Sequence, residues 1–388
     1  MSSPHIMLVC GEPSGDQLGA QLMAALKLLD PGVVISGVGG EAMAGQGLSS
    51  LFSLSDTAVM GLREVVPKIP KILARVDEAV DFAVRTRPDA VVLIDSPDFT
   101  HRIARKLKRR APAIATVNYV APQVWASRAY RAKAMARYLD LVLALLPFEA
   151  PFFESYGLKT VFVGHPVIER AARMQGGPAL RARFSIPPDA CLLCVLPGSR
   201  SNEIRLLLPV FRDVVSLLVR RGVPNLYCVL PTVPHVAQRV REGSVDWPAP
   251  LTILEDEGDK FSAFAAANAA LAASGTVTTE LALARTPLVV GYKLGWLTYK
   301  LMRPFIHAPF ATLVNILLER EAVPERIQER CTPAALADAL LPLLHDGPER
   351  AGQLADLKQA CQILGEGSTA PSRRAAQALL EFVRARKA

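Results

Sequence analysis

The sequence predicts an α/β protein with two parallel sheets, each wound on both faces by helices. Three observations support this prediction. The chain has 388 residues, which is enough for two domains. Its composition, 51% hydrophobic and 21% charged, is typical of a well-buried globular protein rather than a disordered one. Short apolar runs of strand length alternate with helical patterns along the whole chain, which indicates β-α-β units and hence parallel strands.

In the first half, the apolar runs lie at residues 5–10, 33–38, 90–94, 115–119, 141–145 and 160–163. A loop rich in Gly and Ser follows the first run, and we expect a helix from about residue 17 to residue 29 after it. Gly164-His165-Pro166 closes this half, and a Gly-Gly-Pro break at residues 176–178 follows.

The second half repeats the pattern. Its apolar runs lie at residues 191–196, 226–230, 251–254, 269–273 and 287–292, and its amphipathic helices at residues 332–344, 349–363 and 372–386. Two such halves predict two Rossmann-like, doubly wound domains that face a central cleft. We place these domains at residues 1–168 and 169–369. The last helix, at about residues 370–388, is expected to pack back on the first domain.

The net charge of +8 favours anionic partners, which include nucleic acid, phosphorylated substrates and acidic lipid. Nucleic acid fits less well, because aromatic residues make up only 6% of the chain and the basic residues form no dense patch. Most of the six cysteines lie in apolar runs, as buried reduced thiols do, and no signal peptide is evident, so we expect a cytoplasmic protein. No segment approaches the roughly 20 apolar residues of a membrane span.

Ser274-Gly275-Thr276 follows a small-residue apolar run and opens a helix that we expect at residues 277–284. A buried strand that ends in this way presents free backbone N–H groups to an anion. Glu280 lies one helical turn further on, where its carboxylate could reach the hydroxyl groups of a ribose. The layout suits a nucleoside diphosphate, and an ordinary strand-to-helix turn with a Ser or Thr cap is the alternative.

Glu12, Ser14, Gly15 and Asp16 lie in the loop after the first predicted strand. The loop does not have the glycine spacing of a dinucleotide site, and its two acids would repel a pyrophosphate. We therefore expect a site for sugar hydroxyl groups. The alternative is that Ser14 and Asp16 only cap the following helix.

Asp95 comes directly after the apolar run at residues 90–94. Ligands of open α/β sheets bind outside the carboxyl ends of the strands, so a half-buried Asp95 is a candidate general base. In the second half, Arg200 of Pro197-Gly198-Ser199-Arg200 occupies the matching position after a strand and could bind phosphate. The alternatives are a structural Asp95 and a solvated Arg200.

Two segments have the composition of a membrane-surface contact. The first holds Val65, Val66, Ile69, Ile72 and Leu73 beside two lysines, and the second covers residues 296–306, where aromatic residues mix with Lys and Arg. Apolar faces edged by cations suit an interfacial position on anionic lipid. The alternative is a core helix whose lysines reach the solvent.

Several motifs occur in one order along residues 5–345. They are Gly11-Glu12-Pro13-Ser14-Gly15-Asp16, Ala58-Val59-Met60-Gly61, Ile94-Asp95-Ser96-Pro97-Asp98-Phe99, Tyr119-Val120-Ala121-Pro122-Gln123-Val124-Trp125-Ala126, Leu146-Pro147-Phe148-Glu149, Gly164-His165-Pro166, Leu196-Pro197-Gly198-Ser199-Arg200, Ala273-Ser274-Gly275-Thr276 and Val290-Gly291-Tyr292. Together these motifs resemble bacterial lipid-A-disaccharide synthase. The first departs from the family's usual pattern, because Pro13 stands where a Thr is common.

The resemblance implies the GT-B fold, with an acceptor-binding first domain and a UDP-sugar-binding second domain. It implies an inverting glycosyltransferase that joins UDP-2,3-diacylglucosamine to 2,3-diacylglucosamine 1-phosphate through a β-1,6 linkage, peripherally on the cytoplasmic face of the inner membrane. Asp95 would take the general-base position and Glu12 the neighbouring acidic position. Residues placed around UDP are Arg200, Ser274, Gly275, Thr276, Glu280 and Asn315.

No DxD-type acidic pair lies at the diphosphate loop, so we expect neither a metal nor a cofactor. The sequence does not determine the oligomeric state, and a homodimer is one alternative. The alternatives in function are another GT-B enzyme, such as a UDP-N-acetylglucosamine 2-epimerase or a peptidoglycan glycosyltransferase, and a non-catalytic UDP-sugar-binding membrane protein. A soluble epimerase would not need the two apolar and basic segments.

Overall fold

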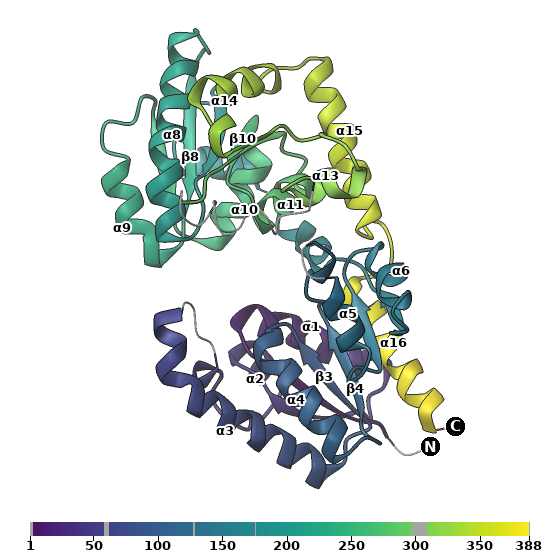
Figure 1. Cartoon of the computed structure of the whole chain (residues 1–388). Helices are drawn as coiled ribbons and strands as arrows, with labels where there is room; N and C mark the ends of the chain where they lie inside the picture. Colours follow the sequence, from purple (N-terminus) through teal and green to yellow (C-terminus); the bar gives the residue numbers. More distant parts are fainter. Residues whose placement is uncertain are drawn as a thin grey trace. The chain divides into compact units, whose positions relative to one another are not determined.

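The fold is that of a computed structural model, which describes residues 3–57, 62–126, 129–174, 176–295, 299 and 309–387. The chain forms two compact units, one of Met1–Pro166 with Gly367–Ala388 and one of Val167–Glu366 (Figure 1). Among the described residues, no helix combines the length and the apolar character that a membrane span requires.

The first unit contains a six-stranded parallel sheet in the order β2-β1-β3-β4-β5-β6. Its strands are β1 (His5–Cys10), β2 (Val34–Val38), β3 (Ala90–Ile94), β4 (Ala115–Tyr119), β5 (Leu141–Ala144) and β6 (Thr160–Phe162). The strand order reverses between β1 and β3, so the carboxyl ends of these two strands form the switch point at which doubly wound sheets bind ligands.

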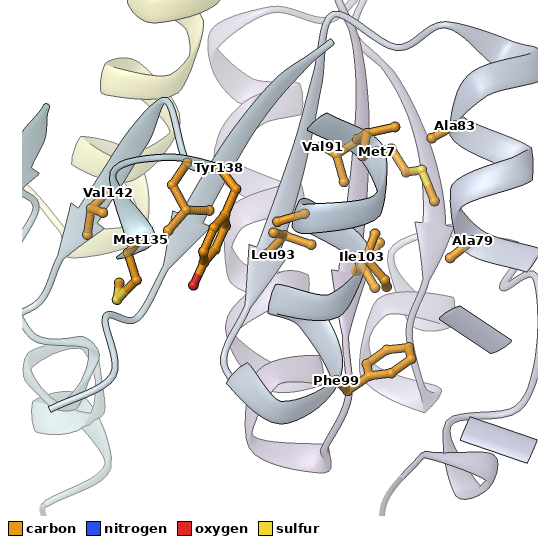
Figure 2. Packing of buried hydrophobic residues seen from close by; sticks show 14 of the residues in the cluster. Met7, Ala79, Ala83, Val91, Leu93, Phe99, Ile103, Met135, Tyr138 and Val142 are labelled. Atoms are coloured by element: carbon orange, nitrogen blue, oxygen red, sulfur yellow. The ribbon is translucent and has the colours of Figure 1, made fainter. Parts of the chain in front are cut away.

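Helices cover both faces of this sheet. They are α1 (Pro13–Leu29), α2 (Glu41–Gly45), α3 (Leu62–Thr86), α4 (Pro97–Arg110), α5 (Tyr130–Met135), α6 (Glu149–Glu154) and α16 (Pro371–Lys387), with 3₁₀ turns at Leu54–Asp56 and Val124–Ala126. On one face, Phe99 and Ile103 of α4 pack against Val91 and Leu93 of β3, beside α3 (Figure 2). On the other face, α1 and α2 share a core with α16, so the last helix packs against α1.

The second unit contains another six-stranded parallel sheet, in the order β12-β11-β10-β7-β8-β9. Its strands are β7 (Cys191–Leu196), β8 (Leu226–Pro231), β9 (Leu251–Leu254), β10 (Ala269–Ala272), β11 (Leu288–Tyr292) and β12 (Glu325–Ile327). The predicted fold class, with two doubly wound Rossmann-like sheets, is therefore confirmed. Strand β12 is absent from the prediction, because only one of its three residues is apolar.

Two layers of helices cover the second sheet. They are α7 (Gly177–Arg183), α8 (Ser201–Arg220), α9 (Pro234–Gly243), α10 (Glu257–Ala266), α11 (Thr276–Leu283), α13 (Leu313–Leu318), α14 (Pro333–Leu340) and α15 (Pro348–Ile363), with 3₁₀ turns at Pro166–Arg173, Gln328–Arg330 and Leu341–Leu343. Cys191 lies in the core beneath α8, whereas Cys194 lies in the core on the other face. Their CxxC spacing therefore does not bring the two thiols together.

Candidate functional site

The first part of the candidate site lies where β1 and β3 end. Cys10 of β1 pairs with Ile94 of β3, so the residues that follow both strands emerge side by side. Glu12 follows β1 and precedes α1, while Asp95 connects β3 to α4. The sheet topology thus brings the two predicted catalytic acids to one edge of the sheet.

Asp95 is half-buried and firmly held. One carboxylate oxygen accepts the N–H of Ser96 at 2.8 Å, and the other accepts the hydroxyl of Ser14 at 3.2 Å. The backbone of Asp95 and Ser96 is left-handed, with φ values of 54° and 44°. Such a conformation costs about 1–3 kcal/mol for each residue and is typical of functional sites. Hydrogen bonds hold it in place, because the Asp95 N–H donates to Tyr119 at 3.1 Å and the Thr100 hydroxyl donates to the Asp95 carbonyl at 2.7 Å.

A cavity of about 450 Å³ opens beside this turn. Its polar lining residues are Glu12, Thr57, Ser96, Asp98 and Arg102, and its apolar ones are Ile69, Ile72, Leu73, Pro97 and Phe99. Asp95 itself is not a lining residue, but its neighbour Ser96 is. The Ser96 hydroxyl is buried and has no hydrogen-bond partner among the described residues. The cavity therefore combines hydrogen-bonding groups with an apolar wall.

Ser14, Gly15 and Asp16 do not lie in a loop, as predicted, but in the first turn of α1, which begins at Pro13. Proline suits this position because the first N–H of a helix has no intrahelical partner. The Asp16 carboxylate is buried and accepts N–H groups of Gly40, Ala42 and Met43 at 2.7–3.1 Å. The Asp16 carboxylate therefore caps helix α2, and its expected place beside an acceptor sugar stays a prediction.

Gly15 has a packing role as well. A Cβ atom at this position would lie 2.9 Å from the Cβ of Cys10 and 3.1 Å from the carbonyl oxygen of Ile94. Glycine therefore allows α1 to approach β1 and β3 closely. Of the three residues, only Ser14 is exposed, and its hydroxyl bonds to Asp95.

Glu149 is a buried acid that the sequence did not single out as a site residue. Its carboxylate accepts the N–H groups of Leu145 at 3.1 Å and Leu146 at 3.0 Å, and the indole N–H of Trp125 at 3.3 Å. These three donors favour the ionised form, but burial outweighs them and raises the pKa of Glu149 to about 7. Glu149 thereby ties the end of β5 to the turn that follows β4.

The raised pKa of Glu149 predicts a pH-dependent stability. Between pH 4.5, the ordinary value, and about pH 7, folded Glu149 keeps a proton that the unfolded chain releases. The free energy of unfolding should therefore fall across this window, by about 3 kcal/mol from this group. From pH 4.5 to pH 8, the unfolding free energy of the wild type should fall by that amount relative to that of Glu149→Gln. Urea titration of both proteins measures this change.

Comparison with Glu149→Gln also removes the opposite contribution of His101, because both proteins contain it. Burial lowers the pKa of His101 from its ordinary value of 6.5 to about 4. Between these two pH values, the contribution of His101 to stability therefore rises with pH. A difference between the two proteins that stays constant with pH would show that Glu149 is already ionised in the acidic folded state.

The second part of the candidate site is a cavity of about 300 Å³ in the second unit, outside the ends of β7, β8 and β10. Five of the residues that we expect around UDP line it, namely Arg200, Ser274, Gly275, Thr276 and Glu280. Gly275 has a φ of 156° and a ψ of −168°, a conformation that is essentially restricted to glycine. The Ser274 hydroxyl donates to the carbonyl of Ala311 at 3.0 Å.

Glu280 is buried and paired with two cations. Its carboxylate forms ion pairs with Arg170 and, at 3.3 Å, with Lys260, and Lys260 also lines the cavity. Burial of a carboxylate requires such partners. The expected contact of Glu280 with a ribose stays a prediction.

Arg200 precedes helix α8, and its side chain is 78% exposed. Glu203 organises this turn, because one of its oxygens accepts the N–H groups of Ser199 at 3.0 Å and Arg200 at 3.2 Å. The other oxygen lies 3.2 Å from the Arg200 guanidinium. Arg200 is therefore tethered at the positive end of a long helix, where an anion is favoured.

The lining residues of the second cavity that were not predicted as site residues include the polar Glu203, Thr232 and Lys260. The Thr232 hydroxyl oxygen is buried and has no hydrogen-bond partner in the described part of the chain. A Thr after a strand is too common to single out this residue from the sequence.

Asn315 lies in a buried hydrogen-bond network, and its expected place near UDP stays a prediction. Its side chain is fully buried, and its amide group donates to Val323 and to Glu325, both at 2.8 Å. Its oxygen accepts the N–H groups of Ala322 and Val323. Because these bonds use the hydrogen-bonding capacity of the carboxamide, Asn315 positions the chain around residues 311–325.

Of the predicted membrane contacts, Ile69 and Leu73 are 43% and 37% exposed, whereas Ile72 packs partly against the core of the first unit. The side chains of Val65 and Val66 lie outside the described residues, as do the motif at residues 58–61 and, apart from Tyr299, the segment at 296–306. No three His, Cys, Asp or Glu side chains of the described ranges lie close enough together to hold a metal ion.

Comparison with known proteins shows which family the chain belongs to. A family model described as lipid-A-disaccharide synthetase matches residues 6–380. Lipid-A-disaccharide synthase of Rhodospirillum centenum is 47% identical over 97% of this chain and 94% of its own length. The enzyme of Paramagnetospirillum magneticum is 48% identical over 98% of this chain and 97% of its own length.

Solved structures support the fold. UDP-GlcNAc 2-epimerase of Neisseria meningitidis superposes with a TM-score of 0.61 at 12% identity and covers 98% of this chain and all of its own. A calicheamicin glycosyltransferase superposes with a TM-score of 0.58 at 18% identity and covers 99% of both chains. Since the full-length matches at 47–48% identity carry one name, the chain belongs to the lipid-A-disaccharide synthase family of glycosyltransferases.

Proposed function

We propose that the chain transfers 2,3-diacylglucosamine from UDP to the 6-hydroxyl of 2,3-diacylglucosamine 1-phosphate, with inversion, to give a β-1,6-linked disaccharide and UDP. The observation that carries the proposal is the family match over nearly the whole chain. The two cavities supply the chemistry that this reaction needs, an acid beside a partly apolar cavity and a cation at helix N-termini.

In the proposed reaction, Asp95 accepts the proton of the acceptor hydroxyl. As that oxygen bonds to the donor sugar's C1, the bond from C1 to the diphosphate breaks, and UDP leaves with the electron pair. The hydrogen bonds to Ser14 and Ser96 fix the Asp95 carboxylate, which preorganises it for proton transfer. Glu12 lines the adjacent cavity and is proposed to bind acceptor hydroxyl groups.

Departure of UDP requires that the charge on the diphosphate be neutralised. Arg200 at the start of α8 and the N-terminal turn of α11, with Ser274, Gly275 and Thr276, are proposed to do this without a metal ion. Glu280 is proposed to bind the ribose, in exchange for part of its pairing with Lys260.

Both substrates carry acyl chains, and we propose that the protein meets them at the anionic cytoplasmic surface of the inner membrane. Ile69 and Leu73 are exposed apolar residues of α3 that line the first cavity, and Lys71 lies between them. This position connects the cavity to a surface that suits anionic lipid.

Replacement of Ile69 and Leu73 together by Ser should lower binding to anionic liposomes in a sedimentation assay and raise the KM for lipid-embedded acceptor. The melting temperature should change little, because both side chains are already well exposed. The matched control is Leu28→Ser with Val219→Ser, which removes two apolar side chains that are 70% and 43% exposed elsewhere. Equal liposome binding by the two double variants would refute the membrane contact.

The proposed function is tested by incubating the protein with UDP-2,3-diacylglucosamine and 2,3-diacylglucosamine 1-phosphate in detergent, with mass spectrometry of the products. We expect UDP and a tetra-acylated disaccharide monophosphate in equal amounts. Conversion of the donor in the absence of acceptor, without disaccharide, would instead indicate an epimerase or a hydrolase.

A further inference from the structure

Arg102 is the only Lys, Arg or His among the described residues that line the first cavity. It lies on α4, one helical turn after Asp98. The Nε–H of Arg102 donates to the backbone carbonyl of Asp98 at 2.8 Å, which fixes the side chain near its base. This bond leaves both terminal amino groups of the guanidinium for another partner.

Two described cations of α3, Lys71 and Arg75, are paired with acids. Lys71 lies 2.6 Å and Arg75 2.7 Å from Asp56, and Arg75 also pairs with Glu78 at 2.5 Å. These contacts from Lys71 and Arg75 lower the pKa of Asp56, so the acid stays ionised as their partner. Further along α4, Arg105 donates to the Tyr138 hydroxyl at 3.2 Å, and Lys106 lies 2.5 Å from Asp77. Within the described ranges, Arg102 forms no ion pair, in contrast to Lys71, Arg75 and Lys106.

A guanidinium without an acidic partner, beside an apolar wall, matches the chemistry of a phosphate on an acylated molecule. Its fork of N–H donors binds phosphate oxygens in a charge-assisted, two-pronged geometry. Ile69, Leu73 and Phe99 supply apolar surface in the same cavity. Asp98 lies in the first turn of α4, where the helix dipole offsets part of its negative charge.

We infer that Arg102 binds the 1-phosphate of the acceptor and so selects a phosphorylated over an unphosphorylated diacylglucosamine. The inference rests on the proposed function, since it concerns the acceptor of that reaction. The phosphate is attached to C1, away from the reacting 6-hydroxyl, so Arg102 acts as a specificity-determining residue. It does not touch the reacting atoms.

The test compares two acceptors, 2,3-diacylglucosamine 1-phosphate and the same lipid without phosphate, in neutral detergent micelles. The wild type should use the phosphorylated acceptor with a higher kcat/KM. Arg102→Ala should lower kcat/KM for this acceptor about 10–100-fold, as expected for a lost charge-assisted contact. It should leave kcat/KM for the unphosphorylated acceptor, and the KM for the donor, unchanged.

Arg109→Ala is the matched control. Arg109 is exposed on the same helix, and its Nε–H donates at 3.3 Å to the carbonyl of Arg105, which likewise lies four residues earlier. It does not line the cavity. This variant should behave as the wild type toward both acceptors. If Arg102→Ala has a lower melting temperature than the wild type, Arg102→Gln and Arg102→Lys are compared instead. Only Lys keeps the positive charge, so only Arg102→Lys should retain part of the preference for the phosphorylated acceptor.

Equal losses with both acceptors, or no loss with either, would overturn the role of Arg102 while leaving the proposed function intact. A loss that appears only on anionic vesicles, and not in neutral micelles, would assign Arg102 to the lipid surface and also overturn it. Failure of the wild type to form disaccharide from either acceptor would reject the proposed function, and the inference would fall with it.

Discussion

Asp95→Asn should lower kcat by about 10²–10⁴-fold, the usual contribution of a general base, and should leave the affinity for UDP near that of the wild type. The amide cannot accept the proton of the acceptor hydroxyl. Asn is the informative replacement because it tolerates the left-handed backbone of residue 95 almost as well as Asp does, so the turn should keep its shape. The measurement is single-turnover disaccharide formation at saturating substrates, with UDP affinity by calorimetry.

Ser14→Ala provides a graded comparison. It removes the hydroxyl that bonds to the Asp95 carboxylate but keeps the acid, so it should reduce kcat much less than Asp95→Asn. If Asp95→Asn retains more than about a tenth of the wild-type kcat, then another group serves as the base.

Arg200→Ala should weaken UDP binding about 10–100-fold, because the diphosphate loses a charge-assisted contact. The side chain is largely exposed, so its removal should not unfold the second unit. Calorimetry with UDP alone measures this effect without the acceptor. The matched control is Arg220→Ala at the opposite end of α8, where the guanidinium bonds only to the Ser216 hydroxyl among its described contacts.

Arg200→Lys should fall between the wild type and Arg200→Ala, because it keeps the charge and loses the forked geometry. A dissociation constant for UDP that is the same in Arg200→Ala and the wild type would remove Arg200 from the site and leave the helix N-termini to bind the diphosphate.

Every strand of the two sheets except β12 could be predicted, because buried parallel strands are mostly apolar runs. Strand β12 could not, since its pairing with β11 depends on the tertiary fold and not on its Glu-Arg-Ile sequence. The start of α1 was also misplaced. Its first turn, with Pro13, Ser14 and Gly15, has the composition of a loop, although Pro at the first helical position is a known start signal.

The candidate site was predictable where it depends on local geometry. Arg200, Ser274, Gly275 and Thr276 follow strand ends directly, and parallel strands bring such ends together. Roles that depend on distant partners were not predictable. The bonds of Asp16 to α2, of Asn315 to Glu325 and of Glu149 to Trp125 join residues from separate elements. The unpaired state of Arg102 likewise depends on which acids the fold places near α3 and α4.

The central claim is a single displacement at the sugar carbon, with Asp95 as the base. The configuration of the new glycosidic bond tests it most directly. One-bond and three-bond coupling constants at the new anomeric carbon, measured by NMR on purified disaccharide made from the α-linked UDP donor, should show a β linkage to C6 of the acceptor. An α linkage would contradict the claim, because a single in-line displacement at C1 of an α-linked donor cannot retain its configuration.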